Sequence, residues 1–126
     1  ATPKPKKLRF PRAARIRLGR EYALVRTEGR SVQGRLLRLS AVKMGDATKS
    51  GETRFGIITS RRVGGAVDRN RVRRRLREIC REQRAQIPPG WLVVVIAKSS
   101  AVASAFADLR EEWLLLARRL SILPRS

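Results

Sequence analysis

One basic segment constrains the fold more than any other part of this chain. Residues 61–84 hold ten arginines against three acidic residues, a density usually found in disordered tails. Within the segment, however, Val72, Leu76, Ile79 and Cys80 recur at the i, i+4, i+7, i+8 spacing of one helical face. The pattern therefore predicts a helix over about residues 66–85, with an apolar side that a domain can hold and a cationic side that it presents.

The segments around this helix predict a small sheet with helices packed on it. We expect a helix at 18–28, strands at 31–43, 54–60 and 91–97, and a last helix at 103–120. The 31–43 region is long enough to be split into two strands. The order α-β-β-α-β-α, or α-β-β-β-α-β-α with the split, predicts a single α+β domain over residues 18–122.

Alternation in the first strand region separates two faces. Leu37, Leu39 and Ala41 share one face, whereas Leu36, Arg38, Ser40 and Val42 share the other.

Residues 1–17 carry seven basic residues, no acidic residue and three prolines. They predict a basic arm that is extended or disordered without its partner.

Charge indicates the kind of partner. The net charge is +20, from 30 Lys and Arg against 10 Asp and Glu, and a polyanion, most often a nucleic acid, offsets such self-repulsion. An anionic membrane surface is the alternative partner, but no segment combines a basic face with a large, exposed Trp, Phe or Leu face. No apolar run approaches the length of a membrane span. Residues 1–17 also lack the apolar core of a secretory signal. We therefore expect a cytoplasmic protein without a membrane partner.

An enzyme working through its own side chains has little support in the sequence. The chain has no histidine, and its one cysteine, Cys80, falls on the apolar side of the predicted helix, which indicates a buried thiol in a reducing compartment. Zinc ligands are lacking, and no acidic cluster suggests a two-metal site. Glu111 and Glu112 are adjacent on the last helix, so we expect them to lie on its solvated face.

The cationic face itself predicts phosphate binding. A solvated helix face normally mixes charges of both signs, whereas most arginines here lack an acidic partner on the helix. Gly64 and Gly65 precede the helix and allow a phosphate to approach the backbone and the N–H groups of the helix terminus. The nucleotide-binding patterns GxxxxGK[ST] and GxGxxG are both absent.

The same residues resemble a known family signature. The string Ser60-Arg61-Arg62-Val63-Gly64-x-Ala66-Val67-x-Arg69-Asn70-Arg71-Val72-Arg73-Arg74 is similar to that of bacterial ribonuclease P protein. The resemblance implies an α-β-β-β-α-β-α sandwich with a left-handed βαβ crossover around the signature helix, a fold shared with a domain of a ribosomal protein. It covers roughly residues 15–120 in order and spacing.

The resemblance also implies a function. The family provides the non-catalytic protein subunit of an RNA-based endonuclease that removes the 5′ leader from precursor tRNA. Its expected partners are the catalytic RNA subunit and precursor tRNA, with no obligate protein partner. The catalytic groups and the Mg²⁺ ions belong to the RNA, so we expect the protein alone to bind no cofactor and no metal.

The family's binding residues map onto positions of this sequence. The RNA-subunit surface would comprise Arg61, Arg62, Arg69, Asn70, Arg71, Arg73, Arg74 and Arg77. The leader cleft would comprise Tyr22, Arg26, Leu37 and Ser40. Several aromatic side chains often line this cleft in the family, and here only Tyr22 remains, which predicts less base stacking.

Two other functions stay open at this point. A ribosomal or other structural RNA-binding protein would share the charge, the size and the α+β build. A protein-only, metal-dependent nuclease is a third hypothesis, which the missing acidic site opposes.

Overall fold

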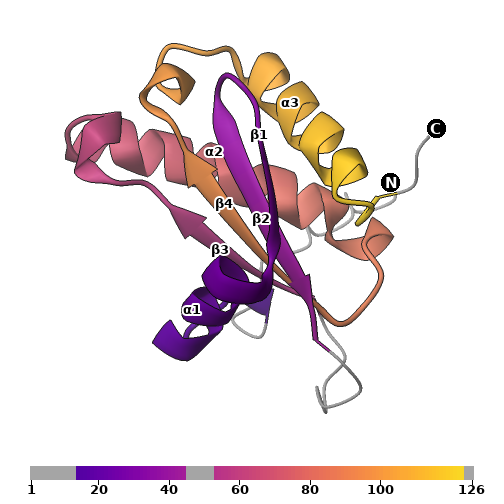
Figure 1. Ribbon diagram of the computed structural model, residues 1–126. Helices are drawn as coiled ribbons and strands as arrows, with labels where there is room; N and C mark the ends of the chain where they lie inside the picture. Colours follow the sequence, from indigo (N-terminus) through magenta and orange to yellow (C-terminus); the bar gives the residue numbers. More distant parts are fainter. Residues whose placement is uncertain (1–13, 45–52, 124–126) are drawn as a thin grey trace, which may run out of the picture.

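A four-stranded mixed sheet separates one helix from the other two. The computed structural model describes residues 14–44 and 53–123. Its main elements are α1 (Gly19–Glu28), β1 (Arg30–Gln33), β2 (Leu37–Lys43), β3 (Arg54–Ile58), α2 (Ala66–Gln83), β4 (Trp91–Ala97) and α3 (Phe106–Arg119). Short 3₁₀ helices lie at Arg61–Val63 (η2), Arg84–Gln86 (η3) and Ser99–Ala101 (η4). In Figure 1, α1 covers one face of the sheet, and α2 and α3 lie on the other.

The strand order is β1-β2-β4-β3, so β3 is an edge strand. β4 pairs antiparallel with β2 and parallel with β3, and α2 connects the two parallel strands. When Figure 1 is turned so that the arrows of β3 and β4 point upwards, β4 lies to the right of β3 and α2 passes behind the sheet. The crossover is therefore left-handed, as the resemblance implied and against the usual preference.

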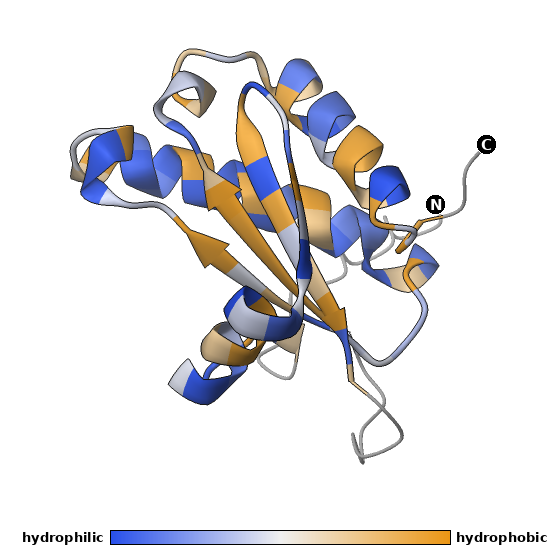
Figure 2. Ribbon diagram, viewed as in Figure 1, coloured by the Kyte–Doolittle hydropathy of each residue, from blue (hydrophilic) through white to orange (hydrophobic). Residues whose placement is uncertain are grey.

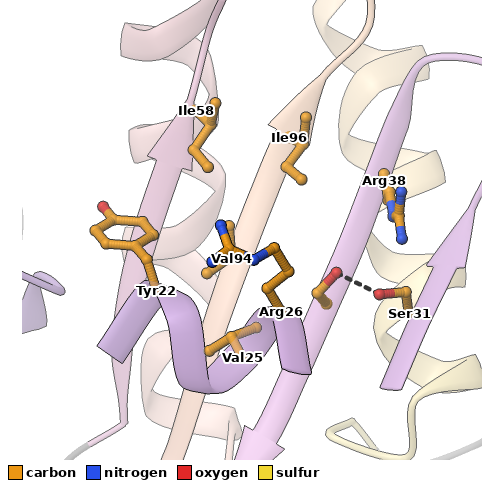
Figure 3. A pocket seen from close by; sticks show the side chains of 9 residues that line it. Tyr22, Val25, Arg26, Ser31, Arg38, Ile58, Val94 and Ile96 are labelled. Atoms are coloured by element: carbon orange, nitrogen blue, oxygen red, sulfur yellow. Dashed lines mark hydrogen bonds between the residues drawn. The ribbon is translucent and has the colours of Figure 1, made fainter. Parts of the chain in front are cut away.

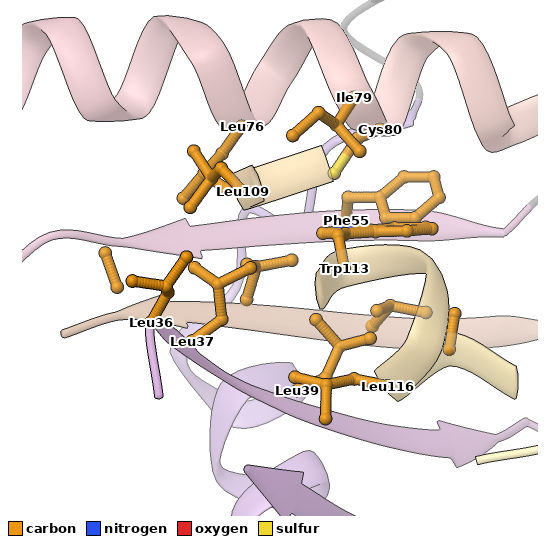
Figure 4. Packing of buried hydrophobic residues seen from close by; sticks show 14 of the residues in the cluster. Leu36, Leu37, Leu39, Phe55, Leu76, Ile79, Cys80, Leu109, Trp113 and Leu116 are labelled. Atoms are coloured by element: carbon orange, nitrogen blue, oxygen red, sulfur yellow. The ribbon is translucent and has the colours of Figure 1, made fainter. Parts of the chain in front are cut away.

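The signature helix packs as its sequence pattern predicted. Val72, Leu76, Ile79 and Cys80 are all buried and point from α2 towards the sheet, where they join side chains of β2, β3 and α3 in the main core (Figure 4). The blue and orange stripes of α2 in Figure 2 show its two sides. Burial raises the pKa of the Cys80 thiol, which keeps it neutral and unreactive.

The long first strand region is split into a hairpin, β1 and β2. Its turn, residues 34–36, is held by a side chain of α3. The Glu112 carboxylate accepts hydrogen bonds from the backbone N–H groups of Arg35 (2.9 Å), Leu36 (2.8 Å) and Leu37 (2.6 Å). The expectation that Glu112 is merely solvated was wrong, because the fold brings the turn against α3; Glu111 does remain exposed.

The domain begins earlier than the predicted residue 18. Ala14 and Ile16 are buried, and the Ile16 backbone N–H donates to the Phe55 carbonyl of β3 (2.8 Å). Residues 14–17 therefore belong to the folded unit rather than to the arm predicted at 1–17. Residues 1–13 lie outside the described residues. Within residues 14–44 and 53–123, no helix is both long and apolar enough to cross a membrane.

Candidate nucleic-acid interface

The arginines of α2 fall into three rows around the helix. Arg74 lies opposite the buried seam, because it is about half a turn away from it. Arg71 and Arg75, one turn apart, lie on the flank facing the loop that follows β4. Arg73 and Arg77, also one turn apart, lie on the opposite flank, towards the β3 edge.

Tertiary contacts distinguish these rows. Arg71 donates to the Val102 carbonyl (3.2 Å) and Arg75 to the Ser104 carbonyl (3.0 Å), so this row is tied to the loop after β4. Arg73 donates to the Thr59 hydroxyl (2.7 Å). Arg74 is exposed, and no hydrogen bond or ion pair is found for it within the described residues. The ten arginines are therefore not equivalent, although the sequence pattern alone presents them as one group.

The residues before α2 continue the cationic surface. Arg61 and Arg62 are exposed on η2. Gly64 has φ +147°, in the region that favours glycine, and an added Cβ there would lie 3.1 Å from the Asp68 carboxylate. An acidic side chain of this chain thus already lies beside the helix entry, so the exposed arginines offer the better phosphate contacts.

A cleft lies between α1 and the sheet, and we call it the α1 cleft. It has a volume of about 200 Å³ and is lined by Tyr22, Val25, Arg26, Ser31, Arg38, Ser40, Ile58, Val94 and Ile96. Three of the four residues predicted for a leader cleft, Tyr22, Arg26 and Ser40, line it. Among the described residues no acidic side chain lines it, so the cleft is suited to an anionic ligand.

The prediction that Leu37 belongs to this cleft was wrong. Leu37 is fully buried and lies in the main core beneath α2 and α3, on the opposite face of β2 (Figure 4). The physical reason is the two-residue period of a strand, which puts Leu37 and Ser40 on opposite faces. The same alternation places Arg38 beside Ser40 in the cleft, and it was the available signal for this missed residue.

The α1 cleft combines an apolar floor with polar walls (Figure 3). Val25, Val94 and Ile96 form the floor. Arg26 extends from α1 over Val94, and Arg38 stands on β2 at the other side. The Ser31 and Ser40 hydroxyls share a hydrogen bond of 2.6 Å, which leaves one of the two O–H groups available to donate to a ligand.

Tyr22 is the aromatic wall of the cleft, and its position is fixed by α1 and β3. Glu21, next to it, is buried and accepts a hydrogen bond from Arg54 of β3 (3.1 Å), with which it forms an ion pair. A Cβ added to Gly56 would lie 2.6 Å from the Tyr22 ring, so only glycine lets the ring lie this close to β3. Burial, with a smaller contribution from the Glu21 charge, raises the pKa of Tyr22, which keeps its hydroxyl protonated as a donor.

A second hollow is also lined by Tyr22, and we call it the β3-edge hollow. It has a volume of about 320 Å³ and is lined by Arg15, Ile16, Tyr22, Phe55, Gly56, Ile57, Arg73 and Arg77. Arg73 and Arg77 thus line the same hollow as Tyr22, although the sequence analysis assigned them to the RNA-subunit surface and Tyr22 to the leader cleft. Over the part of the chain described, no group of three or more His, Cys, Asp or Glu side chains gathers in a metal-binding arrangement.

Comparisons with known proteins agree with this architecture. The ribonuclease P family model matches residues 10–121. The chain is 43% identical over 100 residues to the ribonuclease P protein component of Roseiflexus sp. (strain RS-1), covering 79% of each chain. It is 41% identical over 117 residues to that of Xylella fastidiosa (strain Temecula1), covering 92% of this chain and 82% of the relative.

Solved structures show the same fold. The RNase P protein of Staphylococcus aureus superposes with a TM-score of 0.80 at 21% identity, covering 90% of this chain and all of that one. The RNase P protein of Thermotoga maritima, solved with a fluorophenyl thiourea, has a TM-score of 0.72 at 34% identity. It covers 82% of this chain and 98% of its own.

Proposed function

This chain belongs to the ribonuclease P protein family, and we propose that it binds the catalytic RNA and the 5′ leader of precursor tRNA to assist leader removal. The family places it in bacterial tRNA processing, as a component of an RNA-processing enzyme complex that includes ribonuclease P RNA. This membership disfavours the ribosomal alternative. The finer steps, binding of the leader and its removal, are the substance of the proposal.

The observation that carries the proposal is the proximity of two cationic features on one small domain. A signature helix presents arginines, and a cleft without acidic lining lies across the sheet from it. Guanidinium groups bind phosphates in bidentate fashion. We assign the RNA-subunit contacts to Arg61, Arg62, Arg69, Asn70, Arg71, Arg73, Arg74 and Arg77.

The α1 cleft would hold the single-stranded leader. Its apolar floor suits the faces of unstacked bases, and Tyr22 offers one ring for stacking. Arg26 and Arg38 stand at the walls, where their guanidinium groups would contact phosphates of the leader. Because mature tRNA has no leader, this contact would favour the precursor over the product.

In this proposal the chain supplies no catalytic group. The Mg²⁺ ions that act in cleavage stay with the RNA subunit, in line with the family resemblance. The arginines neutralise crowded RNA phosphates and so lower the Mg²⁺ concentration that the folded RNA requires. The protein thus holds and orients the catalyst and its substrate.

Reconstitution tests this function directly. The protein is mixed with a bacterial ribonuclease P RNA and precursor tRNA at low Mg²⁺, and the mature 5′ end is measured. We expect faster cleavage than with RNA alone. An equal rate would contradict the proposal, and cleavage by the protein without RNA would revive the protein-only nuclease hypothesis.

Substitution of the one aromatic residue in the cleft tests the leader contact. We expect Tyr22→Ala to lower the ratio of precursor to mature tRNA affinity about tenfold, since stacking contributes about 1–3 kcal/mol per base. Tyr22→Phe is the matched control, because it keeps the ring and removes only the hydroxyl. Affinity for the RNA subunit should change little in both variants; an equal loss of both affinities would undo the division of roles.

A further inference from the structure

The β3-edge hollow adjoins the α1 cleft at one residue. Tyr22 lines both of them. β3 is an edge strand of the described sheet, and residues 15–16 pair with its outer edge at Phe55, next to Gly56. Gly56 carries no side chain at the point where the ring lies against β3. A chain in the cleft that passes Tyr22 would meet Arg73 and Arg77 in the hollow.

The hollow gathers positive charge. Three of its eight lining residues are arginines, Arg15, Arg73 and Arg77, and none is acidic. Burial lowers the pKa of Arg77, and the charges of Arg15 and Arg73 lower it further. Like charges held this close destabilise the empty site, and a phosphate among them would relieve the repulsion.

One arginine of the hollow, Arg73, is positioned in advance. Arg73 donates to the hydroxyl of the buried Thr59 (2.7 Å) and, at 3.4 Å, to the Asn70 side chain. Arg77 follows one turn later on the same flank of α2. Because the Arg73 side chain is already ordered, a ligand loses little binding energy to fixing it.

From these observations we infer that the β3-edge hollow binds a phosphodiester of the single-stranded leader, whose path runs from the α1 cleft past Tyr22 to Arg73 and Arg77. This inference rests on the proposed function and moves two arginines from the RNA-subunit surface to the substrate. A phosphate of the RNA subunit offers the same chemistry. We assign the site to the leader because Tyr22 lines both the hollow and the α1 cleft.

The test compares two arginines of one helix. Arg77→Gln removes a charge in the hollow, and Arg74→Gln removes one from the outward row as the matched control. The holoenzyme's affinities for precursor and mature tRNA are measured, together with the protein's affinity for the RNA subunit. We expect Arg77→Gln to lower the precursor-to-mature ratio about tenfold and to leave RNA-subunit affinity unchanged. Arg74→Gln should lower the affinity for the RNA subunit and leave the precursor-to-mature ratio unchanged.

Two further readouts separate charge recognition from a structural effect. Arg77→Gln should reduce the slope of log affinity for precursor against log salt by about 0.7, the value for one phosphate contact of a single strand. Arg77→Lys, which keeps the charge, should restore most of the ratio. Arg77→Gln should not lower the thermal unfolding temperature, because it relieves repulsion with Arg15 and Arg73 and no hydrogen bond or ion pair is found for the Arg77 side chain within the described residues.

The outcomes also separate this inference from the proposed function. If the unmodified protein gives no preference for precursor, the leader proposal fails as a whole. If it does give the preference and Tyr22→Ala reduces it, but Arg77→Gln weakens only the RNA-subunit affinity, then the hollow belongs to the RNA subunit. The inference is then overturned while the proposed function stands.

Discussion

Raising the salt concentration from 50 to 200 mM should weaken the binding of this chain to ribonuclease P RNA by about 10³–10⁵-fold, the range for some 6–10 phosphate contacts. The expectation follows from the ten arginines of residues 61–84 and from the exposure of Arg61, Arg62 and Arg74 among them. Each contact releases condensed counterions from the RNA, and salt opposes that release. Equilibrium binding of the labelled RNA over a salt series gives the slope.

A double variant calibrates this slope. Arg61→Gln with Arg62→Gln should reduce it by about 1.8, the value for two phosphate contacts on a duplex. Both residues lie on η2, away from the buried seam of α2, so the core should be unaffected. A flat response to salt in the unmodified protein would contradict the phosphate-contact model altogether.

Glu112→Ala should lower the free energy of unfolding by about 3 kcal/mol, the upper part of the range for removing a charged hydrogen-bond partner. The carboxylate is the acceptor for three successive backbone N–H groups of the β1–β2 turn. Two of these bonds, to Leu36 and Leu37, are partly shielded from water. Without the carboxylate these donors lose their partner at a cost in desolvation. Urea unfolding followed by circular dichroism measures the loss.

The adjacent residue gives the control. Glu111 carries the same charge on the same helix but is exposed, so Glu111→Ala should change stability by less than about 0.5 kcal/mol. Equal effects of the two substitutions would show that the carboxylate at 112 acts only through its charge. The turn also precedes Arg38 and Ser40 of the α1 cleft, so Glu112→Ala should reduce precursor preference as well.

Local patterns were sufficient for much of the fold. The apolar run at 91–97 predicted β4 at its observed bounds. The apolar spacing through Val72 and Leu76 predicted the buried side of α2, and its end was misplaced by only two residues, because the chain continues into the 3₁₀ helix η3. Such features depend on residues a few positions apart, and so the sequence contains the whole of the information they need.

The α1 cleft was predicted less completely. Tyr22, Arg26 and Ser40 were correctly placed at its walls, whereas Leu37 was not and Arg38 was missed. The error came from mapping family positions without applying the alternation of the strand, which the sequence already displayed. The rest of the lining, such as Val94 and Ile96, depends on which strands become neighbours, and the local pattern does not contain that information.

The sequence by itself determined that this protein has a rigid, arginine-rich helix with one buried side, because charge and apolar spacing are written along a single continuous segment. Only the tertiary structure decided what each arginine faces. Arg71 and Arg75 reach the loop after β4, and Arg73 and Arg77 line the same hollow as Tyr22. The same holds for Glu112 and the hairpin turn, some 75 residues away. Contacts of this kind are set by how distant segments pack around the sheet, and packing of the whole chain fixes them together.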